Sequence, residues 1–144
     1  MREVRFEIAG DAVAQARPRF AVHGGHAVAF DKKESREYKA YVKMLAVKAM
    51  GGQPPIAESG VSVELVVIKR VPKTFSKRKR LEAVEGGAIR PLTKPDVDNV
   101  AKAILDAFKG VVWMDDSQVV DLSISKWYGE SPCTRVAVKE VCGA

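Results

Sequence analysis

Hydrophobic and polar positions along the chain predict several strands before any other feature is considered. The segment Val4–Ile8 alternates apolar and charged residues, which indicates a half-buried strand. Gly24 and Gly25 lie between two further apolar runs and predict the two-residue turn of a hairpin. The segment Val61–Arg70 is apolar at most positions, so we expect a central strand covered on much of both faces.

Two stretches have the apolar spacing of helices. The first follows Asp31 and Glu34, which resemble a capping box, and it extends to about Met50. Its expected apolar stripe is Tyr38, Tyr41, Val42, Leu45 and Ala49. The second follows Pro95 and ends at Gly110. Its expected apolar face is Val97, Val100, Ala101, Ile104, Leu105 and Phe108.

The last third of the chain predicts more strands. Val111–Met114 is expected to be a short strand that enters a turn at Asp115–Ser117. Gln118–Tyr128 is expected to be a long strand, and Thr134–Val141 a final strand at the edge of the sheet. The chain has 144 residues and shows no internal repeat or linker, so residues 1–144 are expected to form a single domain.

Composition narrows the classes of function. The net charge is +6 and the pI is about 9.4, which favours a polyanionic partner, although solubility alone also explains a basic chain. No apolar run reaches the roughly 20 residues that a membrane span needs. The N-terminus is charged and lacks a signal-peptide core. Cys133 and Cys142 have no metal-like spacing, so we expect reduced thiols in a cytoplasmic protein.

Basic residues gather in a loop at about residues 71–94. Ser76 is placed to cap a short helix within it, and Gly86 and Gly87 to end that helix. Few apolar residues anchor this loop, which indicates mobility and ordering on a phosphate backbone. Arg17 and Arg19 flank a proline, and either phosphate contact or a solvated strand edge explains them. The candidate DNA-binding residues are Arg17, Arg19, Lys73, Lys77, Arg78, Lys94 and Asn99.

Acidic residues stand at the start of the second helix and in the turn after it. Asp96 and Asp98 could simply cap the helix, and Asp115 and Asp116 could be plain turn residues. A short strand running back along the helix would instead bring the turn acids to the helix start. Carboxylates meeting there would repel one another unless they shared a hard divalent cation such as Mg²⁺ or Mn²⁺. Such a metal suits phosphodiester hydrolysis, and Lys102 could stabilise its transition state.

Three segments in this region resemble the RusA family of Holliday junction resolvases. They are Lys94–Asn99, Lys102–Asp106 and Trp113–Val120. The segments Ala16–Phe20 and Ser35–Tyr38 are also similar to the N-terminal half of that family. The resemblance covers most of the chain, and its acidic motifs, with their separation, are specific.

The resemblance implies an α+β fold, with a mixed β-sheet and helices packed on it. It also implies a small homodimeric, Mg²⁺-dependent endonuclease that resolves four-way DNA junctions by paired symmetric nicks. Asp96, Asp98 and Asp116 match the family's catalytic metal-binding aspartates. Lys102 matches its catalytic lysine, and Asn99 lies at a motif position suited to orienting a ligand.

Two other classes of function remain open at this point. A DNA-binding module without catalysis would tolerate the loss of the acids and bind DNA better without their charge. A metal-dependent nuclease of another kind would act on flaps, forks or RNA. The junction substrate is therefore an expectation that only a comparison of substrates can test.

Overall fold

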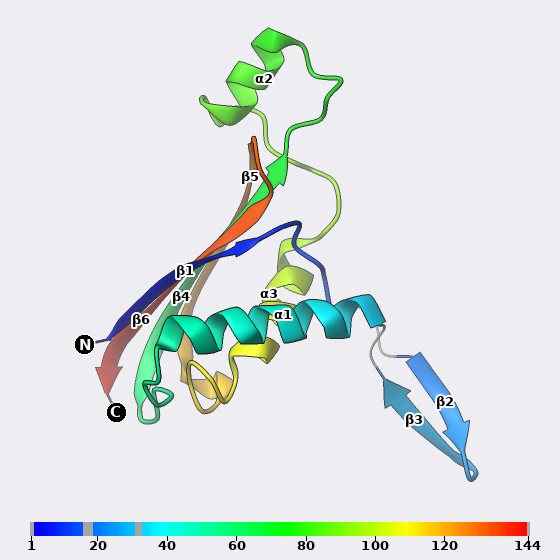
Figure 1. Ribbon diagram of the computed structural model, residues 1–144, viewed down its shortest axis with the longest axis vertical. Helices are drawn as coiled ribbons and strands as arrows, with labels where there is room; N and C mark the ends of the chain where they lie inside the picture. The colour runs from blue at the N-terminus through cyan, green and yellow to red at the C-terminus, as the bar shows by residue number, and fades with distance from the viewer. Residues whose placement is uncertain (1, 16–18, 31–32, 144) are drawn as a thin grey trace.

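A mixed four-stranded β-sheet forms the framework of the protein. The computed structural model describes residues 2–15, 19–30 and 33–143 (Figure 1). The order of the sheet is β1-β6-β4-β5, formed by β1 (Glu3–Ala9), β6 (Cys133–Gly143), β4 (Ser59–Arg70) and β5 (Val119–Gly129). β6 is antiparallel to both β1 and β4, whereas β5 is parallel to β4. The expected α+β fold in a single domain is confirmed.

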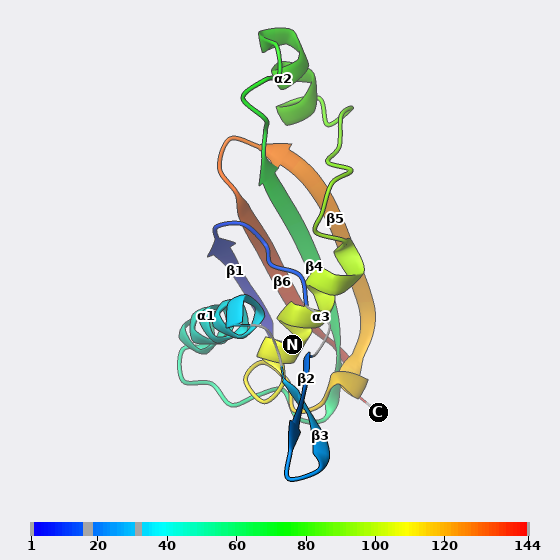
Figure 2. The same ribbon diagram turned by 90° about the vertical axis from the view of Figure 1, so that its right-hand side faces the viewer.

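One face of the sheet carries the core. Helices α1 (Lys33–Met50) and α3 (Val97–Phe108) pack against each other and against this face (Figure 2). The central position of β4 is confirmed, and alternate side chains of this strand, including Val63 and Leu65, are buried under the helices. The expectation that β4 is covered on much of both faces is wrong. The intervening residues of β4, such as Glu64, point to the opposite face, which neither α1 nor α3 covers.

The apolar face of α3 is confirmed at most positions. Its buried residues are Val100, Ala101, Ala103, Ile104, Ala107 and Phe108. Val97 and Leu105 are half-buried at the margins of that face. Because the core takes up this side of the helix, its charged residues are left on the solvent side.

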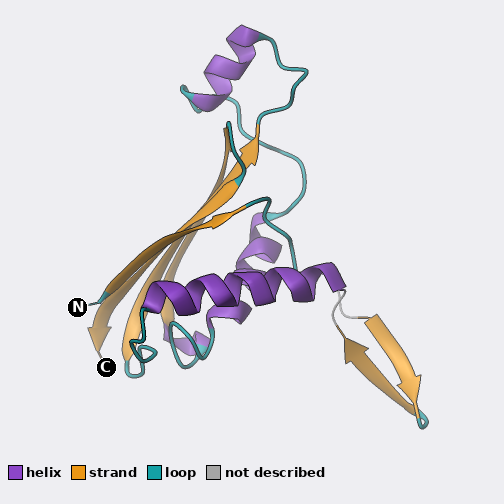
Figure 3. Cartoon of the chain, viewed as in Figure 1, coloured by secondary structure: helices purple, strands orange, loops and turns teal. Residues whose placement is uncertain are grey.

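The expected hairpin is also present. Strands β2 (Arg19–His23) and β3 (His26–Phe30) pair with each other, apart from the main sheet (Figure 3). Gly24 and Gly25 have φ angles of 57° and 84°, which explains why the turn takes glycine at both positions. The predicted capping residue Asp31 lies outside the described residues, so the start of α1 at Lys33 does not test it.

Two other strand predictions are wrong. The last strand, β6, was expected at an edge but is central, because β1 pairs with one side of it and β4 with the other. The two edge strands of the sheet are β1 and β5. Residues 111–114 form turns rather than a strand. The backbone N–H groups of Val111 and Val112 both donate to the Phe108 carbonyl, which closes the chain tightly against the end of α3.

The basic segment at residues 71–94, called the arm below, extends past the end of the sheet (Figures 1 and 2). It contains α2 (Lys77–Val84), and the Ser76 side chain accepts the Lys79 N–H as the sequence predicts. The arm has more anchors than its sequence indicates. Phe75 packs edge-on against Tyr128 of β5, with ring centroids 5.6 Å apart. Its mobility stays a prediction.

Candidate active site

Asp96 precedes α3 as its N-cap residue but does not cap it. The backbone there is extended, with φ −74° and ψ 142°, and the side chain makes no capping hydrogen bond. Instead, Asp96 Oδ2 accepts a hydrogen bond from Lys94 Nζ at 2.8 Å. The Lys94 ammonium lowers the pKa of Asp96 below its usual value, and the charge of Lys126 acts in the same direction. A capping role therefore does not account for this carboxylate.

The first turns of α3 place the other predicted residues beside Asp96. Asp98 and Lys102 are both exposed, and their spacing of four puts them along one edge of the helix. Asn99 is half-buried, and its backbone oxygen accepts the Gln15 N–H at 2.9 Å. The segment that follows β1 thus lies against the start of α3, and the carboxylates stand on a fixed helix end.

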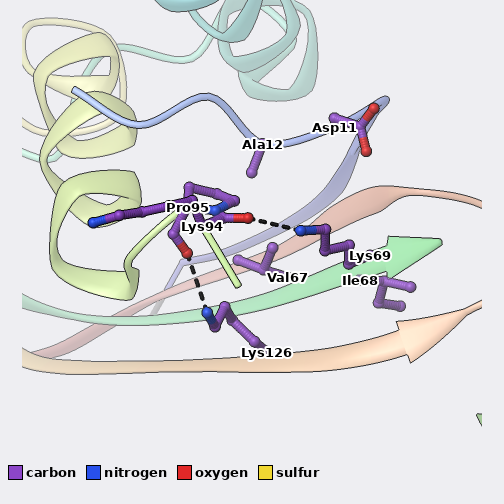
Figure 4. A pocket seen from close by; sticks show the side chains of 8 residues that line it. All are labelled: Asp11, Ala12, Val67, Ile68, Lys69, Lys94, Pro95 and Lys126. Atoms are coloured by element: carbon purple, nitrogen blue, oxygen red, sulfur yellow. Dashed lines mark hydrogen bonds between the residues drawn. The ribbon is translucent and has the colours of Figure 1, made fainter. Parts of the chain in front are cut away.

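Two lysines that the sequence analysis did not select lie beneath this helix start. Lys69 of β4 and Lys126 of β5 reach the backbone just before Asp96 (Figure 4). With Lys94, Pro95 and Asp11 they line an open cavity of about 270 Å³. The sequence signal that could have identified these two residues was a lysine in each of two largely apolar strands, on the face that the helices cover.

The second acidic motif forms a short 3₁₀ helix, η1 (Asp116–Gln118). Asp115 caps it by accepting from the Ser117 N–H and hydroxyl, and these hydrogen bonds lower the pKa of Asp115. Gln118 completes a capping box, because its side-chain oxygen accepts the Asp115 N–H at 2.9 Å. Asp115 therefore has a structural role, and its spacing to Gln118 was a readable signal of that role.

Asp116 is held by the core rather than by the other acids. Its Oδ1 accepts a hydrogen bond from Trp113 Nε1 at 2.8 Å, and the Trp113 ring is fully buried. The ring packs edge-on against Phe108 at the end of α3, with centroids 5.6 Å apart. The indole thus fixes Asp116 close to the C-terminal end of the helix whose N-terminal end carries Asp96 and Asp98.

The structure does not bring Asp116 beside Asp96 and Asp98. Lys126, which contacts the backbone at the start of α3, lies seven residues along β5 from Val119, where β5 begins next to η1. At about 3.3 Å per residue this is roughly 23 Å along the strand. Among the described residues no three acidic, histidine or cysteine side chains form a group that could hold a metal. The expected convergence is absent because residues 109–115 turn at the end of α3 instead of running back along it.

The donor chemistry of the helix start nevertheless fits a hard divalent cation. Asp96 and Asp98 offer carboxylate oxygens, which Mg²⁺ and Mn²⁺ prefer. A cation, the Lys94 ammonium, already lies against Asp96. Two neighbouring carboxylates give part of a metal site, and a further ligand has to come from outside this part of the chain.

The predicted DNA-binding residues divide into those the structure describes and those it does not. Lys73, before α2, and Lys77 and Arg78, within α2, are exposed on the arm. Arg17 lies outside the described residues, and only the backbone of Arg19 is described, at the start of β2. The arm thus presents basic side chains beyond the sheet, on the chain segment that leads to Asp96.

Other basic residues of the arm are used within the protein. Arg90 stacks on the Trp127 ring, with its guanidinium carbon 3.4 Å from the ring centroid. Its Nε also donates to the Lys126 carbonyl at 2.6 Å, on the edge strand β5. Gly87 is required beside this stack, because its φ is +64° and a Cβ there would lie 2.9 Å from the Trp127 ring. Arg80 pairs with Glu130 at 2.8 Å.

Comparisons with known proteins identify the class of this fold and site. The sequence model of the family Endodeoxyribonuclease RusA matches residues 9–139, which is most of the chain. The protein is therefore of the endodeoxyribonuclease class. The chain belongs to the RusA family, and the resemblance drawn from the sequence motifs is confirmed.

A relative of similar length matches this chain over nearly its full length. The uncharacterized protein YqaN of Bacillus subtilis (strain 168) is 39% identical over 139 residues, covering 96% of each chain. No helix in the described part of the chain is long and apolar enough to cross a membrane.

Proposed function

We propose that this protein is a Mg²⁺-dependent, homodimeric endonuclease that resolves four-way DNA junctions by paired symmetric nicks, with a role in recombination and repair. One observation carries the proposal beyond family membership: Asp96 is an N-cap residue whose carboxylate holds a cation instead of capping its helix. The Asp96 carboxylate is therefore not committed to capping the helix and can serve another role.

The residues of the helix start have complementary roles in this proposal. Asp96 and Asp98 hold the metal, and Mn²⁺ is expected to substitute for Mg²⁺. The bound metal lowers the pKa of water and stabilises negative charge on the phosphoryl oxygens. Lys102, one turn beyond Asp98, stabilises the charge that develops in the transition state.

The third carboxylate, Asp116, reaches the metal only if a second chain supplies it. Helix α3 has 12 residues and separates Asp116 from Asp96 within one chain. A helix of that length spans roughly 18 Å, too far for carboxylates to share an ion. A twofold dimer places the same surfaces of two chains against each other. Each site would then combine Asp96 and Asp98 of one copy with Asp116 of the other.

Mixed dimers test this shared site. Asp98→Asn and Asp116→Asn proteins are expected to be inactive when each is prepared alone. A heterodimer of the two variants, isolated with two affinity tags, carries one site with both changes and one intact site. We expect it to recover Mg²⁺-dependent nicking of one strand at about half the parent rate, since one of two equivalent sites is intact. An inactive heterodimer would show that all three acids act within one chain.

In this proposal the arm binds the DNA backbone. Lys73, Lys77 and Arg78 are exposed on it, and Lys94 joins it to the acidic helix start. Cations along this path would neutralise phosphates and make binding weaken steeply with salt. They also draw DNA toward carboxylates that would otherwise repel it.

A competition experiment tests the substrate. We expect a labelled four-way junction to be cleaved at least about tenfold faster than linear duplex of the same sequence, a difference of about 1.4 kcal/mol in transition-state stabilisation. EDTA should abolish cleavage, and Mg²⁺ should restore it. Flap, fork and RNA substrates are included in the same assay. Equal cleavage of junction and duplex would favour a nuclease of another kind, and cleavage in EDTA would exclude the metal-dependent mechanism.

A further inference from the structure

Three consecutive backbone carbonyls before Asp96 accept hydrogen bonds from two lysines. Lys126 Nζ donates to the carbonyls of Thr93 and Pro95, at 2.9 and 3.2 Å. Lys69 Nζ donates to the Lys94 carbonyl at 2.7 Å and to the Thr93 hydroxyl at 2.6 Å. Hydrogen bonds from an ammonium group are stronger than neutral ones. The stretch that leads into α3 is thus tied directly to the sheet.

Both lysines come from paired strands of the main sheet. Lys126 lies opposite Val67 in the register of β4 and β5, two positions from Lys69 on the same face. Val67 is buried, and both lysines are half-buried at the floor of the cavity (Figure 4). Their ammonium groups are therefore held by the sheet, and they transmit its position to the backbone of residues 93–95.

These hydrogen bonds end at Pro95, one residue before Asp96, whose side chain makes no capping hydrogen bond. The side-chain partner of Asp96, Lys94, belongs to the same stretch, so the position of Asp96 depends on the backbone that precedes the helix. The carbonyl of Pro95, the residue before Asp96, is one of the three that the lysines hold. Fixing this carbonyl limits how far the start of α3 can shift, and with it Asp98 in the first turn.

We propose that Lys69 and Lys126 are positioning residues that hold the metal-binding carboxylates in place from below. The inference rests on the proposed function, because it assigns a purpose to the geometry of Asp96 and Asp98. Neither lysine is expected to touch the metal or the scissile phosphate. Their contribution is to preorganise the ligands, which reduces the cost of ordering them when the cation binds.

The charge of Lys126 and its hydrogen bonds have opposite effects on the affinity for a divalent cation. The direction in which the affinity changes therefore tests the proposal. A positive charge near Asp96 opposes the binding of a divalent cation, so removing the charge alone would tighten binding. Removing the hydrogen bonds would loosen the helix start and weaken binding. The direction of the change therefore distinguishes a positioning residue from a bystander charge.

The experiment measures Mn²⁺ binding to the full-length dimer without DNA, by the loss of the free-ion electron paramagnetic resonance signal. We expect Lys126→Met to weaken Mn²⁺ binding about tenfold, the equivalent of losing one hydrogen bond to a charged group. Lys69→Met should act in the same direction. The matched control is Lys139→Met, an exposed strand lysine on the uncovered face of the same sheet. Unchanged or tighter Mn²⁺ binding by Lys126→Met overturns the proposal.

Hydrogen exchange gives a second result that does not depend on nuclease activity. The Val100 amide donates to the Asp96 carbonyl at 3.1 Å, which is the first hydrogen bond of α3. In metal-free protein we expect this amide to exchange about tenfold faster in Lys126→Met than in Lys139→Met. Equal exchange overturns the proposal. If the parent protein binds no Mn²⁺ and yet the exchange rates differ, the proposed metal-dependent function is wrong. The role of Lys126 in holding the start of α3 is then still supported.

Junction binding in EDTA distinguishes positioning from direct phosphate contact. Lys126→Met is expected to bind the junction as the parent does, with the same dependence on salt. Lys126 would instead contact a phosphate if the variant binds more weakly and the slope of log binding constant against log salt concentration falls in magnitude by about one. Such a result, with Mn²⁺ binding unchanged, overturns the positioning role.

Discussion

Replacing Asp98 by asparagine is expected to reduce Mg²⁺-dependent cleavage of a four-way junction by about 10³-fold. The change keeps the size of the side chain but removes the charge that holds the cation. Metal stabilisation of the transition state contributes several kcal/mol, and each 1.36 kcal/mol corresponds to a factor of about ten in rate. Single-turnover cleavage of a labelled junction, alongside a gel-shift measurement of junction binding in EDTA, checks the prediction.

Asp106→Asn is the matched control for this change. Asp106 lies two turns beyond Asp98 along the same edge of α3 and pairs with Lys39 at 3.6 Å. The Asp106 side chain is 54% exposed and that of Lys39 only 18%, so losing this partly exposed ion pair is expected to cost about 1 kcal/mol of stability and to leave cleavage close to that of the parent protein. Equal cleavage by Asp98→Asn and the parent would refute the catalytic assignment and favour a DNA-binding module without catalysis.

Replacing Trp113 by alanine is expected to lower the free energy of unfolding by about 3–5 kcal/mol, the usual cost of deleting a large buried aromatic side chain. Trp113 is fully buried and packs edge-on against Phe108. The change also removes the indole N–H that holds Asp116. Urea denaturation followed by circular dichroism measures the loss.

The neighbouring Met114→Ala variant serves as the control for Trp113→Ala. Met114 is 52% exposed, so its loss should change the free energy of unfolding by no more than about 0.5 kcal/mol. A loss below about 1 kcal/mol for Trp113→Ala would show that the ring is not a principal part of the core. In that case the turn at residues 109–115 would owe its shape to its backbone hydrogen bonds alone.

Local periodicity was enough to predict the helices and the hairpin. The spacing of Val100, Ile104 and Phe108 identified the buried face of α3, because a regular helix leaves a 3.6-residue pattern in the sequence. The glycine pair at 24 and 25 identified the hairpin, because few other residues accept positive φ at two successive positions. Both signals are local, so they survive without knowledge of the tertiary structure.

The order of strands in the sheet could not be predicted in the same way. β6 alternates buried residues such as Val136 with exposed ones such as Arg135, and this alternation fits an edge strand as well as a central one. The alternation arises because α1 and α3 both pack on one face of the sheet and leave the other face of β6 exposed. Strand β5 has exposed Val120 and Leu122 although its sequence resembles an inner strand. Pairing between distant segments decides such positions.

The sequence predicted which elements carry Asp96 and Asp98 but not how the acidic residues are arranged. Asp96 and Asp98 share the start of α3 as the sequence indicated, since a helix fixes neighbours of that spacing. The position of Asp116 depended on an assumed returning strand, whereas the chain turns at Phe108 through backbone hydrogen bonds. Lys69 and Lys126 were not selected, because their shared role depends on the pairing of β4 with β5, which the sequence does not show.

The parallel pairing of β4 and β5 has a consequence for how this fold can diversify. Adjacent parallel strands require a long crossover connection, and here it comprises residues 71–118. This single excursion contains the arm, the acidic helix start, α3 and η1. The other two strands, β1 and β6, lie outside it and continue the sheet beyond β4. Residues can therefore be inserted within this connection without changing the pairing of the four strands.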